Sequence, residues 1–230
     1  MKALKSLEIT SFSLHLIAMT CMLLDHMWAT IIPGNMWMYY IGRLAFPIFA
    51  FLLVEGYFHT KDLKKYMQRL FIVALLSEIP FNLMNSGSII APFHQNVLWT
   101  FLIGLVCLKK IDNKKFSPST LFTCIISILI ATICMCDYGG FGIMTILVFY
   151  FFRKKKLLQL VGLYLINFVF IQNMDIPILN FFFPVQGFAL FSLLFIWLYK
   201  GKQGVHSPWI QWMNYLFYPI HILILSLIAI

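Results

Sequence analysis

The chain has 230 residues, of which 61% are hydrophobic, 17% aromatic and only 11% charged. A soluble domain of this length cannot hide so much apolar side chain in one core, so the composition excludes an ordinary soluble enzyme and indicates an integral membrane protein. Segments able to cross about 30 Å of hydrocarbon recur almost from end to end. We therefore expect residues 1–230 to form a single integral membrane domain.

Apolar runs alternate with short polar connectors along the chain. The first run is too long for the apolar part of a signal peptide and has no small-residue cleavage site, so we expect it to be kept as a helix. The connectors carry helix-ending residues such as Pro33-Gly34-Asn35, Gly139-Gly140 and Asp175-Ile176-Pro177. The runs cover residues 10–32, 36–57, 66–86, 96–108, 118–136, 139–152, 157–173, 184–199 and 208–230. The predicted fold class is an all-α bundle of about nine transmembrane helices, with tilt or re-entrance left open for the short fourth and sixth runs.

Basic residues are confined to alternate connectors. Cytoplasmic loops of membrane proteins keep Lys and Arg, whereas exported loops are depleted of them. Of the 17 basic residues, every one except Arg43 lies on the N-terminal tail or in an even-numbered connector. This pattern predicts a cytoplasmic N-terminus and an external C-terminus. The net charge of +9 is thus a topology signal that also attracts anionic membrane lipid, and no nucleic-acid partner is expected.

Five ionisable side chains lie deep within the apolar runs, away from their cytoplasmic ends. Such groups cost about 2.5 to 3.5 kcal/mol each on insertion scales, so each one requires a partner, a water-filled cavity or a function. Counted along the helices at about 1.5 Å per residue, these side chains lie at a similar depth in the outer half of the membrane: Asp25, His26, Arg43, Glu78 and His221. Their expected convergence is the main indication of a functional site.

Other polar side chains are predicted near the same depth. His15 lies on one stripe of the first helix with His26, as expected for a cavity wall that reaches inward. The remaining candidates share a helix face with one of the five ionisable groups or begin a helix from the outside: Asn82, Gln95, Asn96, Asp137, Tyr138 and Tyr218.

Each of these assignments has a structural alternative. Arg43 can form a buried ion pair with Asp25 or Glu78 that only fastens helices together. His15 can simply hydrogen-bond a backbone carbonyl. Pro80 either frees a carbonyl for a site or only kinks its helix.

Several kinds of site are not expected. His26, Glu78 and His221 are possible metal ligands, but no two histidines have the spacing of a helical metal site, so no metal is predicted. The sequence has no Walker loop and no GxSxG motif. The five cysteines lie in or beside apolar runs without metal spacing, as core residues do.

Short polar motifs recur along nearly the whole chain. They are Met22-Leu23-Leu24-Asp25-His26, Ile41-Gly42-Arg43-Leu44-Ala45-Phe46-Pro47-Ile48-Phe49, Glu55-Gly56-Tyr57-Phe58-His59-Thr60, Tyr66, Arg69-Leu70, Ser77-Glu78-Ile79-Pro80-Phe81-Asn82, Gln95-Asn96-Val97, Asp137-Tyr138-Gly139 and Tyr218-Pro219-x-His221. In order and spacing these motifs resemble the TraX family, named for the conjugal-transfer protein that acetylates the N-terminus of F-type pilin. Through it the chain is similar to the membrane acyltransferases that acetylate cell-surface polysaccharides. The family often has Lys at the position of His15 and Asp at that of Asn82.

The resemblance implies an acetyl-CoA-dependent acetyltransferase in the cytoplasmic membrane of a bacterium. The donor would arrive from the cytoplasm, and the acceptor, a peptide or polysaccharide, would lie outside. Lys64, Lys65 and Arg69 would then hold the nucleotide phosphates, and His15 would lie along the path of the pantetheine arm.

The predicted chemistry centres on His26 as a general base, because imidazole titrates near neutral pH. Glu78 or Asp25 would tune its basicity. Arg43, or the amides of Asn82, Gln95 and Asn96, would stabilise the oxyanion, while Asp137, Tyr138, Tyr218 and His221 would contact the substrate.

Two other functions remain open from the sequence. A proton-coupled small-solute transporter also needs acids and histidines inside the membrane, although no internal repeat supports it. A structural assembly factor of an envelope or conjugation complex would use the same groups only for helix packing.

Overall fold

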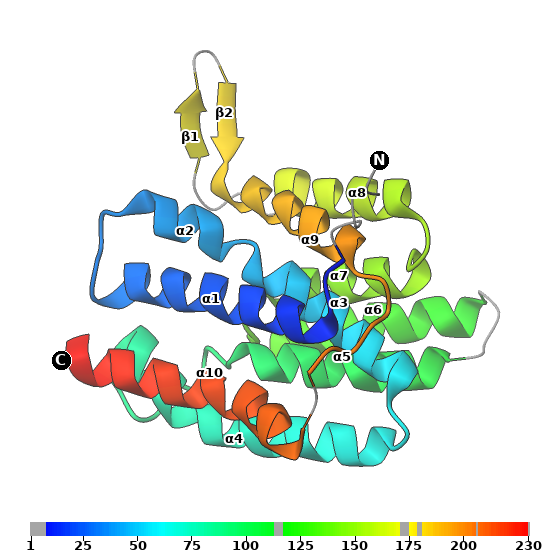
Figure 1. Ribbon diagram of the computed structural model, residues 1–230, viewed down its shortest axis with the longest axis horizontal. Coiled ribbons are helices and arrows are strands. Elements are labelled where there is room, and N and C mark those ends of the chain that lie inside the picture. Colours follow the sequence, from blue (N-terminus) through cyan, green and yellow to red (C-terminus); the bar gives the residue numbers. More distant parts are fainter. Residues whose placement is uncertain (1–7, 113–116, 171–174, 179–180, 206, 230) are drawn as a thin grey trace, which may run out of the picture.

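The computed structural model describes residues 8–112, 117–170, 175–178, 181–205 and 207–229, and helices dominate these residues (Figure 1). The helices in chain order are α1 (Ser11–Thr30), α2 (Met36–Gly42), α3 (Ala45–His59), α4 (Leu63–Ser86), α5 (Val97–Ile111), α6 (Pro118–Ile133), α7 (Gly139–Phe151), α8 (Lys156–Tyr164), the π-helix η1 (Leu165–Phe170), the 3-10 helix η2 (Val185–Phe191), α9 (Ser192–Leu198) and α10 (Pro208–Ala229). An antiparallel hairpin of β1 (Asp175–Ile178) and β2 (Phe181–Pro184) lies between η1 and η2.

The helices correspond to the predicted apolar runs, so the all-α class is confirmed apart from the small hairpin. Four segments are long and apolar enough to cross a membrane: α1, the combined segment Met36–His59, α4 and α10. The least regular helices, η1 and η2, flank the hairpin, where the sequence predicted the Asp175-Ile176-Pro177 connector. The number of crossings and the side of each terminus stay predictions.

The single helix predicted over residues 36–57 is divided into α2 and α3. Pro47 has no backbone N–H, and its ring cannot pack against the carbonyl of residue 43 in a regular helix. The N–H of Leu44 instead donates to the carbonyl of Ile41 at 3.1 Å, which tightens the turn before Pro47. Arg43 therefore lies at the break between two helices.

The central helix of the bundle is α3, whose side chains are buried on all its faces. It packs against α1, α5, α7 and α9, while α4 packs against α10 and α5. In Figure 1, α10 and α4 lie together along one side of the bundle. The interface between this pair and the rest of the bundle positions the candidate site.

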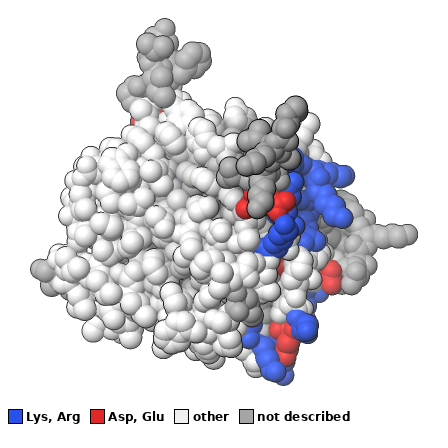
Figure 2. Space-filling view, in the orientation of Figure 1, with Lys and Arg blue, Asp and Glu red and all other residues white. Residues whose placement is uncertain are grey.

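The surface has two distinct zones. Large apolar side chains are exposed along α4, α6 and α10, among them Leu76, Phe122 and Ile224, as expected for helices that face lipid. Basic side chains gather at one end of the molecule (Figure 2). Those exposed there are Lys61, Lys64, Lys65, Lys109, Lys110, Lys154, Lys155, Lys156, Lys200 and Lys202. We call this the basic end; α1, α4 and α10 all begin there (Figure 1).

Candidate functional site: a polar cavity within the bundle

A cavity of about 720 Å³ is lined by residues of α1, α3, α4, α5 and α10. At the basic end its lining includes His59 and Gln203, which lie close to the ends of α3 and α9. Toward the opposite end it includes Asn85, near the end of α4, and His94, just before α5. The cavity thus extends along most of the bundle, and we call its end at His94 the outer mouth.

An ion pair between Arg43 and Asp25 lies in the cavity wall. Nη2 of Arg43 donates to both carboxylate oxygens of Asp25, and both side chains are mostly buried. The guanidinium carbon lies 4.4 Å from the centre of the Tyr39 ring, a cation–π contact. Nη1 reaches Oε1 of Gln186 at 3.5 Å. The buried Nε has no hydrogen-bond partner among the described residues, so Arg43 keeps one donor unused.

The next residue of α1, His26, lies in the same wall and contacts His221 of α10. Nδ1 of His221 is 2.6 Å from the carbonyl oxygen of Phe217. Because a carbonyl only accepts, this nitrogen carries the proton, and Nε2 of neutral His221 has the lone pair. Nδ1 of His26, 2.7 Å from that lone pair, must then be the donor. This assignment of tautomers leaves Nε2 of His26 with a lone pair, as a general base requires.

The partner of His26 differs from the prediction. Asp25 or Glu78 was expected to tune this imidazole, but the hydrogen-bonded partner is His221, predicted as a substrate-binding residue. Adjacent residues on a helix point about 100° apart, so Asp25 turns to Arg43 while His26 turns to α10. Tyr218, on the same face of α10 as His221, also lines the cavity.

Glu78 lies outside the cavity lining and binds the start of α5 instead. Its Oε1 accepts from the indole N–H of Trp99 at 2.6 Å, from the backbone N–H of Asn96 at 3.3 Å and from the Asn96 side chain. Asn96 also caps α5 and donates to the carbonyl of Ala74. The predicted meeting of Glu78 with His26 and Arg43 is therefore wrong.

The rotation of α4 decides this outcome. The α4 residues that line the cavity include Arg69, Val73, Phe81 and Asn85, which recur at helical spacing. Glu78 lies at the edge of this face, and its carboxylate turns toward the start of α5. Depth along the helix was predicted from the sequence, whereas the rotation of the helix depends on its neighbours.

The two predicted amides at this level also serve the loop rather than the cavity. Asn82 donates to the carbonyl of Ile89 at 3.1 Å, and Gln95 donates to that of Pro92 at 2.9 Å. Neither residue, nor Asn96, belongs to the cavity lining. They hold the connector between α4 and α5 in place.

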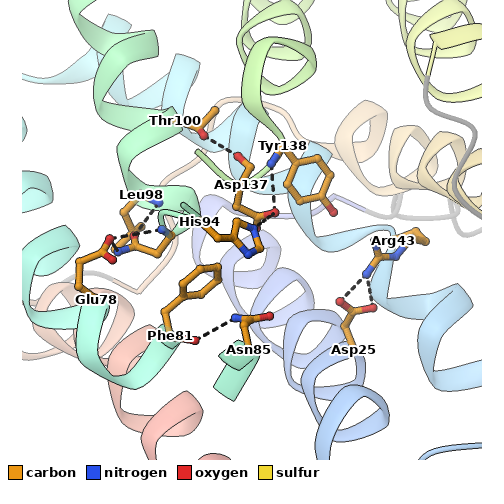
Figure 3. A network of polar contacts seen from close by, with 11 residues as sticks. Asp25, Arg43, Glu78, Phe81, Asn85, His94, Leu98, Thr100, Asp137 and Tyr138 are labelled. Atoms are coloured by element: carbon orange, nitrogen blue, oxygen red, sulfur yellow. Dashed lines mark hydrogen bonds and ion pairs between the residues drawn. The ribbon is translucent and has the colours of Figure 1, made fainter. Parts of the chain in front are cut away.

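Besides Asn85, the polar residues that line the outer mouth include His94, Asp137 and Tyr138 (Figure 3). Nε2 of His94 lies 3.9 Å from Oδ1 of Asp137, and this carboxylate raises the pKa of the half-buried imidazole. The edge of the Phe81 ring packs on His94 at 4.9 Å between centroids. His94 was not among the predicted site residues, although it directly precedes the predicted pair Gln95-Asn96.

At the basic end, Arg69 and His15 line the cavity but Lys64 and Lys65 do not. Both lysines are exposed in the first turn of α4, where Lys65 lies 3.6 Å from Asp62. Arg69 lies 5.9 Å from the centre of the Tyr215 ring, and its buried Nε has no hydrogen-bond partner among the described residues.

His15 hydrogen-bonds the backbone of its own helix, as the structural alternative proposed, with Nδ1 2.8 Å from the Ser11 carbonyl oxygen. A further ion pair joins buried Glu55 to Arg153, at 2.5 and 2.9 Å. The two residues are 98 positions apart, so this pairing depends on the tertiary structure. No group of three or more His, Cys, Asp or Glu side chains suited to a metal occurs in the part of the chain that the structure describes.

A helical bundle with an apolar outer surface, a basic end and an internal polar cavity belongs to the class of polytopic membrane proteins. Comparison with protein families then gives a direct result: the family model described as "TraX protein" matches residues 11–229. The chain belongs to the TraX family. It is 28% identical over 244 residues to a protein of Dichelobacter nodosus described as "Probable fimbrial assembly protein FimC, serogroup H1", and the match covers 96% of each chain. No solved structure matches the chain.

Proposed function

We propose that this protein is an acetyltransferase of the bacterial cytoplasmic membrane, which moves an acetyl group from acetyl-CoA to an envelope or pilin-like acceptor. The observation that carries the proposal is the His26 imidazole in the cavity wall. Its Nδ1 carries the proton and donates a hydrogen bond to Nε2 of His221, so its own Nε2 retains a lone pair. A nitrogen of this kind, in the same cavity wall as an arginine, suits acyl transfer.

The proposed reaction assigns one task to each group. The acceptor amine or hydroxyl attacks the thioester carbonyl carbon and gives its proton to Nε2 of His26. Arg43, whose side chain belongs to the cavity wall, stabilises the oxyanion of the tetrahedral intermediate through its guanidinium charge. The carbon–sulfur bond then breaks, and the His26 imidazolium returns the proton to the CoA thiolate.

The two ends of the cavity suit two different substrates. At the basic end, the exposed lysines raise the local concentration of an anionic donor, and Arg69 offers a phosphate contact inside the cavity. The positive-inside rule makes this end cytoplasmic, where acetyl-CoA is made. The acceptor then enters through the outer mouth at His94 and Asp137. In this arrangement Lys64 and Lys65 attract the donor rather than hold it.

The comparisons support an acceptor of the pilus or envelope. The relative from Dichelobacter nodosus is described as a fimbrial assembly protein. That description equally favours a second candidate, an assembly factor without enzymatic activity. A third, a proton-coupled carrier, is favoured by the extension of the cavity from the basic end to the outer mouth.

Purified protein in lipid nanodiscs separates these functions. We expect it to consume radiolabelled acetyl-CoA, and we expect His26→Gln to abolish the consumption. Mass spectrometry of envelope peptides and polymers, from cells with and without the protein, should reveal the product by its added 42 Da, roughly one acetyl group in place of a hydrogen. Solute uptake into proteoliposomes without acetyl-CoA consumption would support the carrier, and neither activity would support the assembly factor.

A further inference from the structure

Tyr138, between the outer mouth and the buried ion pair, has an unusual backbone conformation. Its φ angle is 59°, in the left-handed region, which bulky side chains rarely adopt. Met135, three residues earlier, is also left-handed, with φ of 51°. Such conformations cost free energy and persist where the surroundings enforce them, commonly at sites that hold a ligand.

The backbone before Tyr138 is fixed to the start of α5. The N–H of Gln95 donates to the carbonyl of Met135 at 3.0 Å, and the N–H of Asp137 donates to that of Gln95 at 2.8 Å. The hydroxyl of Thr100 donates to the carbonyl of Asp137 at 2.5 Å. These hydrogen bonds hold the strained turn in one conformation.

The ring of Tyr138 is fixed from two further sides. It stacks on Phe46 of α3, with 3.8 Å between ring centres and 7° between planes. In α7, Gly142 leaves room for it, since a Cβ added there would lie 3.1 Å from both the Tyr138 Cβ and the Phe46 ring. Contacts with three separate elements thus set the direction of this side chain.

That direction places the phenol between two polar groups of the cavity. In Figure 3 the ring lies between Asp137 and Arg43, with its hydroxyl toward the Arg43 side. Tyr138 lines the cavity together with both of these residues. None of the described residues forms a hydrogen bond with its oxygen. If Tyr138 only filled space, a phenylalanine would do so without placing an unpaired hydroxyl in the bundle.

We propose that Tyr138 orients the acceptor: its hydroxyl contacts the nucleophilic amine or hydroxyl group as that group passes from the outer mouth to His26. This inference rests on the proposed acetyl transfer. A phenol both accepts and donates hydrogen bonds. It therefore accepts the second hydrogen of an amine whose first is directed at His26, and it donates to the oxygen of an alcohol.

The test is Tyr138→Phe, which removes the hydroxyl and keeps the ring stack. The matched control is Tyr40→Phe, because Tyr40 also stacks on a phenylalanine, Phe188, with 4.8 Å between ring centres, but does not line the cavity. Each variant is assayed in nanodiscs for two reactions, hydrolysis of radiolabelled acetyl-CoA by water and transfer to the envelope preparation whose acetylation depends on the wild-type protein.

We expect Tyr138→Phe to reduce transfer about five- to tenfold, the usual effect of one lost hydrogen bond. Hydrolysis should fall less than transfer, and the KM for acetyl-CoA and the melting temperature should stay at wild-type values. Tyr40→Phe should change none of these quantities. Wild-type transfer by Tyr138→Phe, or a parallel fall in hydrolysis and transfer, would overturn the inference. If wild-type protein and His26→Gln are equally inactive toward acetyl-CoA, the proposed function itself fails, an outcome distinct from normal transfer by Tyr138→Phe.

Discussion

Two buried polar clusters in this bundle look alike in the sequence and differ in the structure. Each contains a carboxylate inside an apolar helix, Asp25 in α1 and Glu78 in α4. Glu78 accepts from Asn96 and Trp99 and lies away from the cavity. Asp25 pairs with Arg43 in the cavity wall, where Arg43 still has an unused donor.

This difference distinguishes a carboxylate that joins two helices from one that belongs to a candidate site. The hydrogen bonds to Glu78 come from Asn96 and Trp99 at the start of α5, so this carboxylate joins two helices outside the cavity lining. Asp25, His26 and Arg43 line the cavity, and Nε2 of His26 keeps a lone pair. Burial of a charge in a membrane is thus a weak sign of function until its partners are counted.

The largest expected effect comes from His26→Gln, which removes the imidazole from the open cluster. Because general-base catalysis contributes about 10²- to 10⁴-fold to a rate, we expect acetyl-CoA turnover to fall by at least about 10²-fold. Turnover is measured per folded molecule, quantified by size-exclusion chromatography in detergent. Normal turnover by the variant would rule out His26 as the base.

Asp25→Asn should rank next, because it leaves the buried Arg43 cation without its counterion. Breaking a buried pair from one side typically costs about 3–5 kcal/mol, so the melting temperature should drop. The double variant Asp25→Asn/Arg43→Gln should regain much of that stability while staying inactive. Recovery of activity along with stability would show that the ion pair only fastens helices.

Gly42→Ala tests the space that the ion pair needs. A Cβ at residue 42 would overlap the Asp25 carboxylate, so we expect a loss of about 1–3 kcal/mol from overpacking together with reduced turnover. Gly104→Ala is the matched control, since its added Cβ meets only the side chain of Ile146. Gly104→Ala should lower the melting temperature without lowering turnover per folded molecule.

Glu78→Gln should affect stability alone. Hydrogen bonds to a charged group contribute about 1.5–3 kcal/mol to stability. The glutamine side chain keeps an acceptor oxygen at this position, but an amide oxygen accepts more weakly than a carboxylate oxygen. We expect a lower melting temperature with turnover per folded molecule at the wild-type value. A loss of turnover as large as that of His26→Gln would show that Glu78 also takes part in the reaction.

The smallest effect is expected at the outer mouth and depends on pH. Asp137 raises the pKa of His94 in the folded protein, so the pair stabilises the fold below the unfolded pKa of about 6.5. That contribution is lost as the pH rises through the raised pKa. Because the side chains are half-exposed, it should be below about 1 kcal/mol. The melting temperature of the wild type should therefore exceed that of His94→Asn by more at about pH 5.5 than at about pH 9. An equal difference at both pH values would contradict the pairing.

Much of the candidate site was predictable from single residues. His26 and Arg43 were identified because polar groups inside apolar helices demand an explanation. Asp137 was identified at the outer start of a predicted helix and Tyr218 on the same helix face as His221, and all four residues line the cavity. His94 was missed because a polar residue is expected in a connector and therefore does not by itself indicate a site.

What the sequence determined by itself is local: the apolar runs that become helices, the breaks at proline and glycine, and the concentration of lysines at one end. These features depend on the composition of short segments and on their preference for lipid or water. The tertiary structure alone decided which face of each helix lines the cavity and which partner each polar group finds. Helix rotation follows from packing between segments far apart in the chain, which is why Glu78 turned to α5 and His26 found His221.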